Sequence, residues 1–153
     1  MIRLVRNRLR ILIVDDDPEI CEYLKKGLIR RGQYRVLVAR KGTIGLLLAT
    51  SRWHKPNLVL LDLMMEGVDG FEVLRRLKNS PRTMYIPVII VTASPDYESK
   101  IKAEGLYCDD YIVKPVDLDT LLGRIQDLFK KRGLIEEARG TDEKNRPVSI
   151  GEN

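Results

Sequence analysis

The chain has 153 residues and a mass of 17.6 kDa, the size of one ordinary domain with little room for a second. Apolar residues make up 44% and charged residues 32%, a composition that excludes an intrinsically disordered protein. The sequence has no apolar run as long as a membrane span and no secretory signal pattern, so we expect neither membrane insertion nor secretion.

The formal net charge of +5 is concentrated at the amino terminus. Residues 1–10 contain four arginines and no acidic residue, whereas residues 11–130 carry 18 basic and 17 acidic residues. Residues 131–153 carry five of each. Four arginines without aromatic residues or a reading helix predict only salt-sensitive, non-specific attraction to nucleic acid. We therefore expect no specific nucleic-acid partner.

Cysteine and histidine are scarce in this chain. Cys21 and Cys108 are far apart and match no metal-binding spacing, and the single histidine, His54, excludes a histidine-rich metal site. This usage favours a reducing, cytoplasmic location.

The first apolar run, residues 11–14, is typical of a strand buried on both faces. Asp17 and Pro18 then have the residue types of a helix N-cap and a first helical residue. Apolar residues at every fourth position give the helix that follows one apolar face, and Gly32 ends it.

The same alternation continues along the chain. The sequence predicts a strand at 34–39, a helix at 43–52, a strand at 57–61, a turn at 67–70, a helix at 71–77, a strand at 87–91, a helix at 95–105, a strand at 110–113 and a helix at 118–129. This order predicts an α/β fold, a doubly wound five-stranded parallel sheet with helices on both faces.

Polar residues follow four of the predicted strands. Asp15 and Asp16 follow the first, Asp62 the third, Thr92 the fourth and Lys114 the fifth. Because ligands of open parallel sheets bind at the carboxyl ends of the strands, we expect these side chains to meet at one edge. Clustered carboxylates need a counter-charge, and Mg²⁺ with oxygen ligands supplies one, with Mn²⁺ as an alternative.

Such a cluster predicts phosphoryl chemistry. An aspartate beside a divalent cation can act as a nucleophile towards phosphorus, while a lysine and a hydroxyl pair with phosphoryl oxygens. Each residue also has an ordinary interpretation: an N-cap, a loop acid or a solvated lysine. Their joint occurrence in order at the strand ends favours a common site.

Four stretches together resemble the receiver domain of two-component response regulators, of the chemotaxis-regulator-like kind. They are ILIVDDDP at 11–18, LLDLMM at 60–65, VTA at 91–93 and YIVKP at 111–115. The resemblance covers about residues 9–132 and implies the flavodoxin-like strand order 2-1-3-4-5. It divides the chain into a basic extension (1–9), a receiver domain (10–132) and a polar tail or linker start (133–153).

The resemblance also assigns roles at the metal site. Asp62 would be the phosphoacceptor and a metal ligand, Asp16 the direct Mg²⁺ ligand and Asp15 the acid that holds a metal-bound water. Met64 would offer its backbone carbonyl to the metal.

Further roles concern the switch. Thr92 would be the hydroxyl that moves towards the phosphoryl group, Lys114 the phosphoryl-binding lysine, and Tyr111 the aromatic residue that follows activation. A cis bond between Lys114 and Pro115 is expected. The face formed by residues 95–105, 110–113 and 118–129 would be the signalling surface, and a homodimer through that face is one arrangement the resemblance implies.

Two positions depart from the family pattern. Glu66 stands where receiver domains usually have proline, which frees the loop after Asp62 and adds a negative charge without removing a ligand. Gly105 lies two residues before the usual glycine position, so the helix at 95–105 is expected to end differently.

The resemblance predicts a phospho-accepting switch rather than a conventional enzyme: it would catalyse only its own phosphoryl transfer and dephosphorylation. Its phosphodonor would be a sensor histidine kinase or a phosphotransfer protein. It would act on a downstream protein target or through a missing output domain, as a stand-alone receiver or as a piece of a longer chain. A phosphoester hydrolase using Asp62 and a phosphorylation-independent scaffold are the alternatives.

Overall fold

Five strands alternate with five helices within residues 9–136, the part of the chain that the computed structural model describes. The elements are β1 (Arg10–Val14), α2 (Pro18–Arg30), β2 (Arg35–Ala39), α3 (Gly42–Thr50), β3 (Leu58–Leu61), α4 (Gly70–Asn79), β4 (Val88–Thr92), α5 (Tyr97–Ala103), β5 (Asp110–Val113) and α6 (Leu118–Lys131). Nearly all of the expected basic extension and most of the expected polar tail lie outside the described residues. Within 9–136, no helix has the length and apolar character to cross a membrane.

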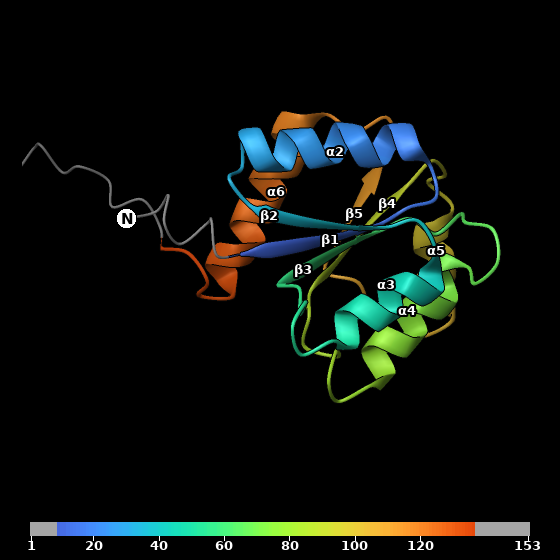
Figure 1. Ribbon diagram of the computed structural model, residues 1–153. Coiled ribbons are helices and arrows are strands. Elements are labelled where there is room, and N and C mark those ends of the chain that lie inside the picture. The colour runs from blue at the N-terminus through green and yellow to red at the C-terminus, as the bar shows by residue number, and fades with distance from the viewer. Residues whose placement is uncertain (1–8, 137–153) are drawn as a thin grey trace, which may run out of the picture.

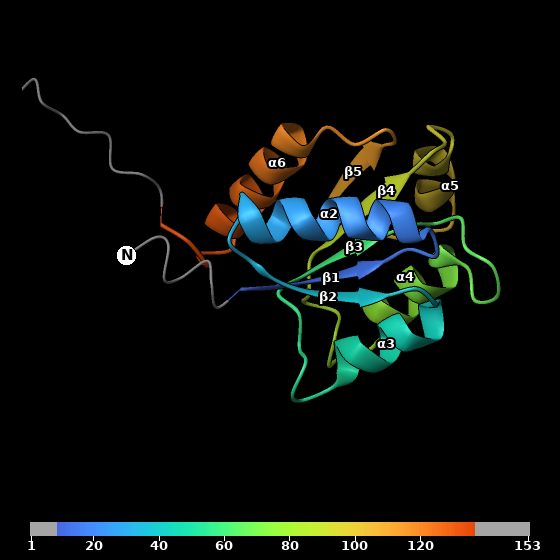
Figure 2. The same ribbon diagram turned by 45° about the horizontal axis from the view of Figure 1, so that its top comes forward.

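The strands form one parallel sheet in the order β2-β1-β3-β4-β5. Helices α2 and α6 cover one face of the sheet, and α3 and α4 lie against the other (Figure 1). Helix α5 lies on the same side as α3 and α4, near β4. In the turned view of Figure 2, α2 passes in front of the sheet, and the arrows of the strands point towards the same side of the molecule. The predicted fold class and strand order are therefore confirmed.

The sheet separates two apolar cores because successive side chains of a strand point to opposite faces. In β1, Ile11 and Ile13 belong to the core beneath α2 and α6, whereas Leu12 and Val14 belong to the core beneath α3 and α4. All four are at most 1% exposed, and burying each such side chain contributes about 1.5–3 kcal/mol. The continuous aliphatic run in the sequence reflects this burial on both faces.

Aspartates begin three of the helices. Asp17, Asp69 and Asp117 each accept a hydrogen bond from a backbone N–H in the first turn of α2, α4 and α6. This capping satisfies N–H groups that have no partner within a helix, and the negative charge suits the helix dipole. The predicted N-cap at Asp17 and first helical residue at Pro18 are confirmed.

Helix α5 is shorter than the predicted helix at 95–105. Pro95 and Asp96 lie in a turn, and the helix ends at Ala103 because Gly105 adopts a positive φ of 67°. The N–H of Leu106 donates to the carbonyl of Ile101 (2.9 Å), and the N–H of Gly105 donates to that of Lys102 (3.0 Å). This pair of bonds is a Schellman motif, which a glycine in the left-handed region makes without strain.

Glycine at position 70 is required by a close backbone approach at the start of α4. A Cβ atom there would overlap the carbonyl oxygen of Asp62 and the Cα of Leu63, neither of which can rotate away. We expect Gly70→Ala to lower the free energy of unfolding by about 1–3 kcal/mol, measured by urea denaturation.

Gly123, on the exposed face of α6, provides the matched control because a Cβ there has no neighbour within 4 Å. Gly123→Ala should raise the free energy of unfolding by about 0.5–1 kcal/mol, since alanine is the better helix former. Equal effects of the two substitutions would contradict the close approach at Gly70.

Candidate functional site

The predicted site residues gather at the carboxyl ends of β1, β3, β4 and β5. Backbone hydrogen bonds extend the sheet to reach them: the N–H of Asp15 donates to Ala39 (3.1 Å), that of Asp62 to Val14 (2.9 Å) and that of Lys114 to Thr92 (2.7 Å). The sheet therefore sets the positions of these residues. The Lys114–Pro115 peptide bond is cis, as the resemblance implied.

Lys114 brings a positive charge between two buried carboxylates. Its Nζ lies 2.9 Å from Oδ2 of Asp15 and 3.5 Å from Oδ2 of Asp62. The side chains of Asp15 and Asp62 are 3% and 5% exposed, and that of Lys114 is 15% exposed. Charges this deeply buried are costly unless paired, so the lysine offsets the desolvation and repulsion of both acids.

Opposing effects act on the pKa of the Asp62 carboxyl. Burial raises the pKa of the Asp62 carboxyl above its ordinary value, and the charge of Asp15 raises it further. The backbone N–H of Met64, which donates to Oδ1 at 3.1 Å, and the Lys114 ammonium act in the opposite direction. Burial also lowers the pKa of Lys114, but the hydrogen bond and charge of Asp15, together with Asp62, raise it overall.

Three carboxylates converge closely enough to share a cation. Asp15, Asp16 and Asp62 each offer one oxygen, and these three oxygens lie within 4.8 Å of one another. The donor set fits Mg²⁺ or Mn²⁺, which prefer carboxylate oxygens. Met64, whose carbonyl the resemblance assigned to the metal, follows Asp62 by two residues and has a 53% exposed side chain.

Thr92 and Tyr111 lie on neighbouring strands beside this cluster. Thr92 is fully buried, and its Oγ1 has no hydrogen-bond partner among the described residues. A buried hydroxyl without a partner is costly, so a ligand oxygen at the site would find a donor there. The hydroxyl of Tyr111 donates to the carbonyl of Ser94, which ties β5 to the loop after β4.

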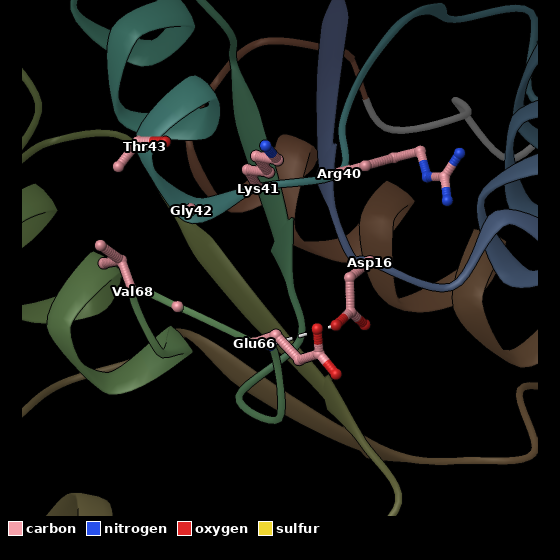
Figure 3. Close-up of a pocket in the computed structure, with 8 residues that line it drawn as sticks. Asp16, Arg40, Lys41, Gly42, Thr43, Glu66 and Val68 are labelled. Atoms are coloured by element: carbon pink, nitrogen blue, oxygen red, sulfur yellow. Dashed lines mark hydrogen bonds between the residues drawn. The ribbon is translucent and has the colours of Figure 1, made fainter.

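A groove of about 950 Å³ opens beside the cluster (Figure 3). One wall is formed by Asp16 and Glu66, and the other includes Arg40, Lys41 and Thr43 at the start of α3. Arg40 and Lys41 were not among the residues predicted for the site, which follow four strands other than β2. Arg40 and Lys41 directly follow β2 in the sequence. Because the carboxyl ends of parallel strands lie at one edge of the sheet, this position would have predicted that they lie beside the acidic cluster.

Comparison with known proteins agrees with this geometry. The model of the response regulator receiver domain matches residues 11–126, most of the chain. The chain belongs to this family. Protein PilH of Pseudomonas aeruginosa is 42% identical to this receiver domain over 116 residues, which cover 76% of this chain and 93% of PilH. The CheY-like receiver domain protein of Methanospirillum hungatei has 30% identity and a TM-score of 0.72, covering 82% of this chain and 96% of its own.

Several relatives of the receiver domain are longer proteins. The DNA-binding dual master transcriptional regulator RpaA of Synechocystis is 40% identical over 129 residues, which cover 84% of this chain and 52% of RpaA. Response regulator PleD of Caulobacter vibrioides is 33% identical over 141 residues, only 30% of its length. The chain thus spans about half of RpaA and less than a third of PleD.

The raised pKa of Asp62 predicts how the stability of the folded protein depends on pH. Because the folded-state pKa lies above that of the unfolded chain, stability is fully present below the unfolded pKa and is lost as pH rises through the folded pKa. In metal-free buffer at pH 7, Asp62→Asn should therefore unfold a few degrees above the wild type. The difference in unfolding temperature should disappear near pH 3, where Asp62 is protonated in both the folded and the unfolded protein.

The matched control is Asp127→Asn, an exposed aspartate on α6, which should leave the unfolding temperature unchanged at both pH values. Asp15 lies 2.9 Å from the Lys114 ammonium and is not altered by the Asp62 substitution, so we expect the lysine charge to stay paired. An unfolding temperature for Asp62→Asn at or below that of the wild type at pH 7 would contradict the desolvation argument.

Proposed function

We propose that this receiver domain is a phospho-accepting switch and that Asp62 is its phosphoacceptor. The carrying observation is the buried arrangement of Asp62 opposite the Lys114 ammonium, within 4.8 Å of two further carboxylates. An acid in this setting faces a fixed positive charge that would stabilise the charge developing on phosphoryl oxygens during attack on phosphorus.

In the proposed transfer, a carboxylate oxygen of Asp62 forms a bond to phosphorus while the bond from phosphorus to the donor nitrogen of a phosphohistidine breaks. Lys114 pairs with the phosphoryl oxygens that gain charge, and the Thr92 hydroxyl donates to one of them. Asp16, Asp62 and the Met64 carbonyl would hold Mg²⁺, with Asp15 completing the acidic set. Bound Mg²⁺ or Mn²⁺ would neutralise the carboxylates and the incoming phosphoryl oxygens.

The added charge would then bias a surface. A phosphoryl group on Asp62 gives Lys114 a new partner and gives the unpartnered Thr92 hydroxyl an acceptor. Movement of Thr92 would displace Tyr111 on the neighbouring strand β5. The Tyr111 hydroxyl donates a hydrogen bond to the carbonyl of Ser94, in the loop after Thr92. The affected face is α5–β5–α6, which corresponds to the signalling surface expected from the sequence.

The partners and extent of the domain follow from the same proposal. A sensor histidine kinase or phosphotransfer protein would be the donor, and a downstream protein or an output domain would read the α5–β5–α6 face, through which a homodimer would also form. The receiver domain would occupy residues 10–132 and act in the cytoplasm. Its catalysis would be limited to its own phosphorylation and dephosphorylation.

Intact mass spectrometry tests this function. After incubation with a small-molecule phosphodonor and Mg²⁺, the protein should gain the mass of one phosphoryl group, and the gain should disappear when the metal is chelated. Asp62→Asn should show no gain, whereas the exposed Asp127→Asn should be phosphorylated like the wild type.

Two results would contradict the proposal. Absence of any mass gain with all donors would favour a phosphorylation-independent scaffold. Release of phosphate from free phosphoesters far beyond one equivalent per protein would favour a hydrolase.

A further inference from the structure

The loop between β3 and α4, residues 62–69, contacts Asp16 through one hydrogen bond. The backbone N–H of Glu66 donates to Oδ2 of Asp16 at 3.2 Å, across 50 positions of the chain. Figure 3 shows this bond and the two side chains facing each other at the wall of the groove. It joins the loop after Asp62 to the loop after β1.

Fewer contacts hold the Asp16 carboxylate than hold the carboxylates of Asp15 and Asp62. Asp15 accepts from the backbone N–H of Asp17 and pairs with Lys114, and Asp62 accepts from Met64 and pairs with Lys114. Within residues 9–136, the Glu66 N–H is the one hydrogen-bond donor to the Asp16 carboxylate, and that carboxylate forms no ion pair. Asp16 is also less buried than Asp15 and Asp62. Without this bond, its orientation would be the least constrained of the three.

The residue type at position 66 decides whether the bond exists. Proline, the usual residue here in the family pattern, has no backbone N–H and cannot donate. Glutamate has one, and any other non-proline residue would as well. The departure noted in the sequence therefore changes the backbone chemistry of the site as well as its charge.

We propose that Glu66 is a positioning residue for the cation site: its N–H holds one oxygen of Asp16 and pre-orients this carboxylate to bind a divalent cation. This rests on the proposed function, in which Asp16 is a metal ligand. A carboxylate that is already held loses less rotational freedom when the cation binds, which strengthens binding. The exposed Glu66 carboxylate adds a separate attraction that salt screens.

Two substitutions separate the N–H from the charge. Glu66→Gln keeps the N–H and removes the charge, whereas Glu66→Pro removes both. Binding of Mn²⁺ by isothermal titration calorimetry, without phosphodonor and at about 0.15 M salt, should be within about twofold of the wild type for Glu66→Gln. Glu66→Pro should bind about three- to tenfold more weakly than Glu66→Gln, the effect of one hydrogen bond.

A second measurement guards against a direct effect of proline on the loop. In the metal-free wild type, amide hydrogen exchange followed by NMR should show protection of the Glu66 N–H, and Asp16→Ala should abolish it. Thermal unfolding of each variant establishes that it folds.

The outcomes distinguish the two proposals. Equal Mn²⁺ affinities for Glu66→Pro and Glu66→Gln, or an unprotected Glu66 amide, would overturn the positioning role and leave the cation site intact. A wild-type protein that binds no Mn²⁺ would overturn the cation site itself, and the positioning role with it.

Discussion

The buried ammonium of Lys114 is the interaction on which the rest of the site depends. It lies 2.9 Å from Asp15 and 3.5 Å from Asp62, two buried carboxylates whose charges would otherwise have no positive partner beside them. One positive charge beside two negative charges leaves the cluster with an excess of negative charge, which favours binding of a divalent cation. Because β1, β3 and β5 each contribute one member, the cluster also needs a parallel sheet in this order.

The site combines a rigid part with an adjustable part. Asp15, Asp62 and Lys114 are held by backbone bonds that continue the sheet, so the phosphoryl chemistry would occur on a fixed platform. Asp16 and Thr92 are different, since Asp16 is bonded only to the Glu66 N–H among the described residues and the Thr92 hydroxyl lacks a partner there. The Thr92 hydroxyl has no bond to give up, so a phosphoryl oxygen can engage it at low cost, whereas the single bond from Glu66 holds Asp16 in place for a cation.

Most of the fold and much of the site could be predicted from the sequence, because side-chain type carries the information. Aliphatic runs mark strands buried on both faces, and Asp17 with Pro18 marks a helix start. The end of α5 was predicted less well, since Gly105 stops the helix through a backbone conformation. The Glu66 bond was not predictable either: its donor is a main-chain N–H, and its acceptor lies 50 residues away.

In the proposed switch, Asp62 and no other acid of the cluster takes the phosphoryl group. The most direct measurement is reduction of the phosphorylated protein with borohydride, which converts an aspartyl phosphate to homoserine, followed by peptide mass spectrometry. We expect homoserine at position 62 alone and no homoserine without the phosphodonor. Homoserine at Asp15 or Asp16, or a phosphoryl group on a residue outside the cluster, would contradict it.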